Sequence, residues 1–158
     1  MKKQKIYIET TLFNFYFDKN REAHAATVKL FKEIAVGKYE AFTSGAVIEE
    51  LAEASTEKYE KMFSLIGEYN ITVLNVSEEA EKLADIYVSE NVIPLKYRAD
   101  GVHIAVAAVN DLDIIISMNF QHIVKRKTKL ATGSINAING YRAIEIFNPM
   151  EVVENEID

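Results

Sequence analysis

The chain has 158 residues, of which 49% are hydrophobic, so it is long enough to bury the core of one ordinary domain. It contains no cysteine, which excludes disulfides, thiolate metal sites and a cysteine nucleophile, and which suits a reducing compartment. Its formal net charge of −6 argues against nucleic-acid binding over the whole surface. No apolar run approaches the length of a transmembrane helix, and no cleavage site follows the basic N-terminus, so we expect a cytoplasmic protein without a membrane partner.

Along most of the chain, apolar residues repeat with the two-residue period of strands or the 3.6-residue period of helices. Taken from the N-terminus, this periodicity predicts strand 4–8, helix 28–35, strand 39–42, helix 47–52, helix 57–69, strand 71–76, helix 77–87, helix 100–110, strand 114–116 and strand 142–147. Glu9-Thr10-Thr11 is interpreted as the exit loop of the first strand, and residues 136–140 as a short helix and turn before the last.

Residues that start and stop helices support these boundaries. Ser44 and Ser77 stand before predicted helices, where a hydroxyl can accept a hydrogen bond from a free backbone N–H. Gly37 supplies the stop of the first predicted helix. Asp100 opens a helix that is too apolar and too rich in small residues to be a surface helix. A carboxylate in that position can stay ionised in a recess and hold a cation, because the helix dipole favours negative charge there.

Short apolar strands that alternate with helices indicate a parallel sheet covered on both faces. We therefore predict an α/β fold, a single-domain three-layer sandwich with a central, mostly parallel sheet. The domain is expected to span residues 1–150, followed by an acidic C-terminal tail at 151–158.

Polar residues are predicted to gather at one edge of this sheet, because sites in parallel sheets form beyond the carboxyl ends of the strands. Glu9 follows the first strand, Asn119 follows the fourth, and Asp100 heads its helix. Glu49 and Glu50 both fall in the helix after the second strand. They lie about 100° apart around that helix, so only one can face the site, and helical phase does not decide which.

Three carboxylates at one edge would repel one another, so a hard divalent cation is their natural partner. Oxygen ligands alone favour Mg²⁺ or Mn²⁺ over Zn²⁺. Such an ion can bind a phosphate oxygen and lower the pKa of a bound water for attack on a phosphodiester. The residues therefore predict a Mg²⁺ or Mn²⁺ site.

The arrangement resembles the PIN domain, a family of small metal-dependent ribonucleases that includes many bacterial and archaeal toxins of toxin–antitoxin pairs. The resemblance covers nearly the whole chain and rests on four segments in this order: Ile6-Tyr7-Ile8-Glu9-Thr10-Thr11, Ser44 through Glu49-Glu50-Leu51, Ala99-Asp100-Gly101-Val102-His103-Ile104-Ala105 and Ile116-Ser117-Met118-Asn119-Phe120. The family pattern places its second acid directly before Leu51, which selects Glu50 over Glu49.

The resemblance implies an endoribonuclease with Glu9, Glu50, Asp100 and Asn119 as catalytic residues. Glu9, Glu50 and Asp100 would be the metal ligands, directly or through water, and Asn119 would complete the hydrogen-bond shell. It also implies an RNA substrate and, for toxins of this family, a small antitoxin partner and a homodimer.

Two residues depart from the family pattern. The family usually has Asp where this chain has Glu9, whose extra methylene moves the carboxylate by about 1.5 Å. The position of Asn119 is often Asp, although an amide can still donate and accept hydrogen bonds. The segment from Ser117 to His122 resembles a branch of PIN-like proteins with a Ser/Thr-x-Asn-Phe-x-His pattern. These departures leave two alternatives: a catalytically degenerate PIN-like module that binds RNA or protein, and an unrelated α/β domain with a coincidental acidic edge.

A basic cluster begins shortly after Asn119 and consists of Lys125, Arg126, Lys127 and Lys129. Taken by itself it could be a solvated loop. Beside an acidic site, however, a cationic rim would steer an RNA backbone. We therefore predict these four residues as RNA-binding.

Three residues near the predicted site also have plain structural interpretations. Asp100 alone would be interpreted as a helix cap, and its acidic neighbours favour the ligand role. His103 lies one helical turn after Asp100 and is interpreted as a hydrogen-bonded structural histidine. For His122, contact with substrate and stabilisation of a turn both remain open.

Overall fold

The structure is a computed structural model and describes residues 2–153. It contains one five-stranded sheet in the order β3-β2-β1-β4-β5, in which all neighbouring strands are parallel. The strands are β1 Gln4–Ile8, β2 Tyr39–Ser44, β3 Thr72–Leu74, β4 Ile114–Ile116 and β5 Glu145–Phe147. Because the chain builds outward from β1 in one direction and then continues at β4 on its other side, the strand order reverses between β1 and β4.

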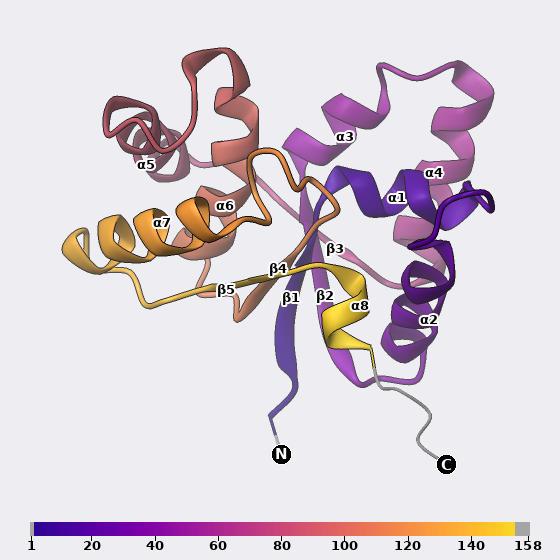
Figure 1. The fold of residues 1–158 in the computed structure, drawn as a ribbon. Coiled ribbons are helices and arrows are strands. Elements are labelled where there is room, and N and C mark those ends of the chain that lie inside the picture. Colours follow the sequence, from indigo (N-terminus) through magenta and orange to yellow (C-terminus); the bar gives the residue numbers. More distant parts are fainter. Residues whose placement is uncertain (1, 154–158) are drawn as a thin grey trace.

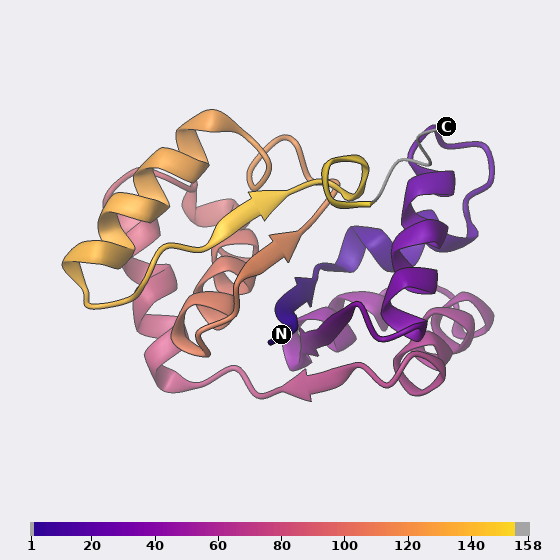
Figure 2. The same ribbon diagram turned by 90° about the horizontal axis from the view of Figure 1, so that it is seen from below.

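The helices form two layers around this sheet (Figures 1 and 2). Helices α5, α6 and α7 cover one face, and α1, α2 and α4 cover the other. The bounds are α1 Thr10–Phe17, α2 His24–Ala35, α3 Gly45–Leu51, α4 Thr56–Glu68, α5 Glu78–Ser89, α6 Arg98–Val109, α7 Arg126–Ile138 and α8 Pro149–Val152, with a 3₁₀ turn η1 at Leu95–Tyr97. The predicted α/β class with a central parallel sheet is therefore confirmed.

The core is centred on β1, β4 and α6. Ile6, Tyr7 and Ile8 of β1 are 0% exposed, and α6 is buried along residues 101–108. Gly101 permits the close packing of α6 on its neighbours, because a Cβ there would lie 3.2 Å from the Ile93 side chain. No helix in the described part of the chain is long and apolar enough to cross a membrane.

The segment Glu9-Thr10-Thr11, predicted as a loop, instead begins a helix. Glu9 is the N-cap of α1, and its side chain accepts a hydrogen bond from the backbone N–H of Thr11. The prediction missed α1 because its aromatic residues, Phe13, Phe15, Tyr16 and Phe17, follow one another too densely for a helical period to stand out. Helix α1 therefore starts at Glu9, a residue of the candidate site.

Other boundaries also differ from the prediction. Strands β3 and β5 are shorter than predicted, because each lies at a sheet edge and pairs with one neighbour. Helix α6 begins two residues before Asp100, so Asp100 lies in its first turn and is not its cap. The basic cluster is not a loop: Lys125 is the N-cap residue of α7 and the other three lie in its first four positions.

The C-terminal segment contains a short helix that the sequence prediction did not include. Helix α8 starts with a capping box between Asn148 and Glu151, and Pro149 occupies its first turn. It spans the predicted domain boundary at residue 150. Of the predicted acidic tail, residues 154–158 lie outside the described residues.

Candidate functional site

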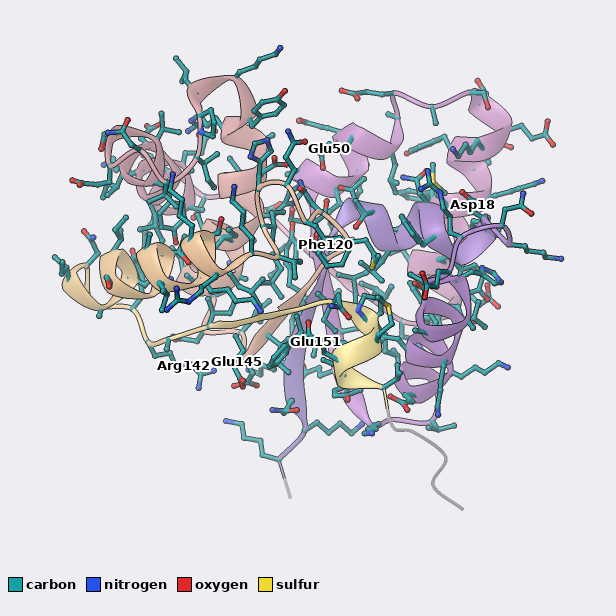
Figure 3. All side chains as sticks on the ribbon, in the orientation of Figure 1. Asp18, Glu50, Phe120, Arg142, Glu145 and Glu151 are labelled. Atoms are coloured by element: carbon teal, nitrogen blue, oxygen red, sulfur yellow. The ribbon has the colours of Figure 1, made fainter. Side chains whose placement is uncertain are left out.

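The candidate site lies at the carboxyl ends of β1 and β4, where the strand order reverses and where parallel sheets form their binding crevices. Glu9 directly follows β1, and its backbone N–H donates to the carbonyl of Ile116 at the end of β4. Figure 3 shows Glu50 and Phe120 toward this end of the sheet, with Arg142 and Glu145 toward the other end.

Glu9 is held by donors that all contact one of its oxygens. Its side chain is 3% exposed, and Oε1 accepts from Thr11 Oγ1 at 2.6 Å, Ser117 Oγ at 2.6 Å and Thr11 N at 3.2 Å. Among residues 2–153 no hydrogen bond to Oε2 is formed, so this oxygen is left for another partner. Burial raises the pKa of Glu9 above its ordinary value, although the charge of His103 and these hydrogen bonds oppose the shift.

The contacts of Glu50 are likewise made by one of its two oxygens. Its Oε1 accepts a short hydrogen bond from Thr10 Oγ1 and lies 2.6 Å from His103 Nε2. Burial by itself would raise the pKa of Glu50, but the hydrogen bond and charge of His103 and the hydrogen bond from Thr10 lower it. Glu49 makes neither contact, and it lines, together with Glu50 and Glu53, an adjacent cavity of about 640 Å³.

A buried chain of hydrogen bonds connects Glu50 to the second strand. His103 Nδ1 lies 2.7 Å from the hydroxyl of Tyr7, which in turn lies 2.7 Å from Ser44 Oγ. Tyr7, Ser44 and His103 are each 0% exposed. Burial opposes the charged form of His103, but the hydrogen bond to Glu50 and the charges of the nearby carboxylates raise its pKa overall. The predicted hydrogen-bonded role of His103 is confirmed by these contacts.

Glu9, Glu50 and His103 form a tight cluster in which one potential ligand atom from each lies within 4.8 Å of the others. The set fits a divalent cation, because each carboxylate has one oxygen that no donor of the described residues contacts, and because burial of Glu9 raises its pKa despite the opposing charge of His103. Asp100 lies outside this tight cluster, although its charge and that of Glu50 interact. The structure thus brings Glu9 and Glu50 together and adds His103 to them.

Asp100 and Asn119 form the other half of the site. Burial raises the pKa of Asp100, while a hydrogen bond from the Asn119 side chain and the charges of His103 and His122 oppose the shift. Asn119 Oδ1 accepts from the backbone N–H of His122 at 3.0 Å, which leaves its amide nitrogen to donate to Asp100. The His122 ring stacks on Tyr97 with the centroids 4.2 Å apart. His122 therefore makes contacts that stabilise the turn.

The basic cluster follows this turn at the start of α7. Arg126 and Lys127 are exposed, and Lys125 and Lys129 are half-buried. The Nζ of Lys129 lies 5.7 Å from the centroid of the Phe147 ring. Along the chain, the cluster begins six residues after Asn119.

Sequence reasoning missed several residues that shape the site: Tyr7, Thr10, Thr11, Ser44 as a site residue, and Ser117. The hydroxyl residues directly beside Glu9, and Ser117 directly after β4, were the available signal, since a buried carboxylate needs hydrogen-bond donors. Tyr7 gave no signal, because a tyrosine in a buried strand is most simply interpreted as core.

Comparison with solved structures supports the predicted fold, whereas the two sequence comparisons find no match. No protein-family model matches the sequence, and no curated protein matches it. Among solved structures, VapC20 from Mycobacterium tuberculosis, a toxin that cleaves the sarcin–ricin loop, superposes with a TM-score of 0.58 and 12% identity, covering 88% of this chain and 98% of that one. VapBC2 from Rickettsia felis, in a structure bound to a DNA fragment from the VapBC2 promoter, superposes with a TM-score of 0.60 and 9% identity. This match covers 92% of this chain and 98% of that one. At these identities the likeness concerns the fold, and the chain therefore has the PIN-like fold that its motifs predict.

Proposed function

We propose that the chain is a Mg²⁺- or Mn²⁺-dependent endoribonuclease that hydrolyses RNA phosphodiester bonds. The observation that supports this proposal is the convergence of Glu9, Glu50 and His103 within 4.8 Å at the carboxyl edge of the sheet, where within residues 2–153 one oxygen of each carboxylate has no donor. The fold likeness to a toxin that cleaves the sarcin–ricin loop points in the same direction.

Each residue has a defined task in this proposal. Glu9 and Glu50 hold the ion through their free oxygens, and Asp100 completes the ligand set directly or through water. Asn119 orients Asp100, and His103 orients Glu50. A bound divalent ion supplies a water of lowered pKa and neutralises charge on the phosphate. Lys125, Arg126, Lys127 and Lys129 bind the RNA backbone beside the site.

The nuclease proposal is tested by comparing the wild-type protein with a Glu50→Gln/Asp100→Asn double variant. Mn²⁺ binding is titrated calorimetrically, and cleavage of structured RNA is followed, with an RNA hairpin of the sarcin–ricin type among the substrates. We expect saturable binding and cleavage by the wild type and loss of both in the double variant. A Glu57→Gln/Glu78→Gln protein is the matched control, since both carboxylates are exposed on α4 and α5. Equal background cleavage by all proteins, without saturable metal binding, would leave the non-cutting binding module as the better description.

We further propose a small antitoxin protein as partner and a homodimer as the assembly of the free chain, both in the cytoplasm. The likeness to VapC20, described as a toxin, and to VapBC2 supports the antitoxin, whereas the homodimer rests on the resemblance of the motifs to the PIN family. Co-expression with the product of a neighbouring small reading frame should give a complex by light scattering in which RNA cleavage is suppressed. A chain that stays monomeric at every concentration contradicts the dimer, and failure to form a complex contradicts the antitoxin.

A further inference from the structure

Phe120 is a large aromatic side chain that is exposed at the edge of the candidate site, and the proposed reaction assigns it no task. It directly follows Asn119 and is 48% exposed, whereas Ser117 and His122, on either side of it in the chain, are buried. Figure 3 shows Phe120 toward the same end of the sheet as Glu50. A segment anchored in the protein thus presents one apolar ring to solvent beside the candidate metal ligands.

The loop that carries Phe120 is held by hydrogen bonds on both sides of this residue. Before it, the backbone N–H of Asn119 donates to Ser117 Oγ at 2.9 Å. After it, the backbone N–H groups of Ile123 and Val124 donate to the Asn119 carbonyl at 3.1 and 2.8 Å, and both of these residues are buried. The backbone therefore holds Phe120 at the surface, and a ligand that contacts the ring does not have to order the loop first.

Groups that suit a polynucleotide lie on both sides of Phe120 along the chain. On one side, the side chain of Asn119 donates to Asp100, a candidate metal ligand. On the other side, the basic cluster begins at Lys125, five residues later. A phosphodiester at the metal and a neighbouring phosphate at the basic cluster would bring the nucleoside between them to the loop that carries the ring. Single exposed apolar side chains are common, so it is the position of Phe120 between these groups that indicates a ligand.

We propose that Phe120 positions the RNA substrate by stacking on one nucleobase, next to the phosphodiester that is cleaved. This role rests on the proposed function, because it requires RNA at the candidate site. Every base has a π face, so stacking holds a nucleotide in place without selecting its identity. The base must leave one of its faces free for the ring, and a base inside a regular helix does not.

The chain has no tryptophan, so Phe120→Trp places a single fluorescent reporter at the proposed contact. An indole ring keeps the stacking surface, and a base that stacks on it should quench its fluorescence. Single-stranded oligoadenylate is titrated against the whole chain with a chelator, and again with Mn²⁺ by rapid mixing before cleavage. We expect saturable quenching by this strand. A ribose–phosphate chain of the same length without bases should bind more weakly and cause no quenching.

The affinities of single-site variants separate stacking from contacts with the phosphates. Phe120→Ala should weaken the binding of oligoadenylate about tenfold or more, while its affinity for the base-free chain should equal that of the wild type. Phe120→Leu keeps an apolar side chain but lacks the ring face, so it should show the same selective loss, whereas Phe120→Trp should keep the wild-type affinity. Arg126→Glu/Lys127→Glu should instead weaken the binding of both strands, because it removes phosphate contacts.

Phe63 is the matched control, because it is 42% exposed on α4 and makes none of the contacts described for the candidate site. Phe63→Trp should show no quenching by oligoadenylate, and Phe63→Ala should bind this strand as the wild type does. Circular dichroism checks the fold of each variant. The fluorescence of Phe120→Trp tests the stacking role even where Phe120→Ala does not fold.

The outcomes separate the stacking role from the proposed function. A wild-type protein that neither binds oligoadenylate nor cleaves RNA with Mn²⁺ overturns both. A wild type that cleaves RNA, beside an unquenched Phe120→Trp protein or a folded Phe120→Ala protein of unchanged affinity, overturns only the role of Phe120. Quenching by the base-free chain, or equal quenching in Phe63→Trp, also overturns that role. Quenching and a selective loss of affinity in a protein that cleaves no RNA support stacking and contradict the nuclease.

Discussion

Glu9 serves both the local backbone and the site. Its carboxylate caps α1 through Thr11, and it also accepts a hydrogen bond from Ser117, which follows β4 on the neighbouring strand. A side chain at this position must therefore turn back to its own helix while it contacts the next strand. The additional methylene of glutamate, compared with the aspartate usual in PIN domains, suits that double contact.

The raised pKa of Glu9 predicts how the metal-free protein responds to pH. The folded protein retains a proton on Glu9 at pH values at which the unfolded chain has released it. Stability should therefore fall as the pH rises from the ordinary glutamate value, about 4.3, through the raised value of Glu9. The raised pKa of His103 also makes the stability fall with rising pH, but at higher pH values. The lowered pKa of Glu50 changes the stability only below the ordinary glutamate pKa, and therefore outside this pH window.

Because a divalent ion displaces the Glu9 proton, Mn²⁺ affinity should rise with pH over the same window. Calorimetry in buffers of different ionisation enthalpy measures the proton released on binding, and urea unfolding with a chelator measures the stability. Glu9→Gln should remove its part of the pH dependence from both measurements. Equal pH dependence in Glu9→Gln and wild type contradicts the assignment.

Asn119 joins two parts of the site, and Asn119→Asp should separate them. An aspartate can still accept from the backbone of His122, but it cannot donate to Asp100 and places a like charge beside it. We expect the metal-free protein to lose about 1–3 kcal/mol of unfolding free energy. Added Mn²⁺ should restore part of this loss. Asn139→Asp is the control, since its exposed amide donates to the carbonyl of Ile135 in its own helix, and an equal loss there would show a general effect of the substitution.

At the level of elements, the sequence predicted what periodicity and end signals encode and missed what depends on contacts in space. The helix with Ser77 as its cap was found because its apolar face, Ala80, Leu83, Ala84 and Tyr87, repeats with the helical period, and all four side chains are buried. Helix α1 was missed, because its cap is a glutamate and its aromatic residues mask the period. That element begins at Glu9, so the error fell where the site is built.

The basic start of α7 is electrostatically unusual, because the N-terminus of a helix disfavours cations. Arg126→Glu/Lys127→Glu should therefore stabilise the protein by about 0.3–1 kcal/mol per substitution. The same change should weaken RNA binding and flatten its salt dependence, since each lost phosphate contact lowers the slope by roughly one. Urea unfolding and RNA binding over a series of salt concentrations measure the two effects.

Lys82→Glu on α5 is the control for this change, because it reverses an exposed charge on another helix. It should alter the overall charge without changing the salt slope. An unchanged slope in Arg126→Glu/Lys127→Glu, or an equal change in Lys82→Glu, would rule out α7 as the RNA contact.

For the molecule as a whole, the sheet order explains why the sequence could place Glu9 and Asn119 at one edge. Both follow strands whose carboxyl ends meet where the strand order reverses, and that meeting follows from the parallel arrangement alone. The sequence could not show that His103, one turn beyond Asp100, contacts Glu50 more closely than Asp100 does. That contact depends on how α6 packs against α3, which periodicity does not encode.

The candidate ligands come from elements that are distant in the sequence, so a bound ion should stabilise the whole fold. Glu9 joins β1 to α1, Glu50 belongs to α3, and Asp100 belongs to α6. With Mn²⁺ at a hundred times its dissociation constant, binding should add about 2.7 kcal/mol to the unfolding free energy. Hydrogen exchange at the starts of α1 and α6 should slow together, since the ion links both. Thermal unfolding over a Mn²⁺ series measures the gain, which Glu50→Gln/Asp100→Asn should abolish and Glu57→Gln/Glu78→Gln should keep; a gain that survives the first double variant would place the ion elsewhere.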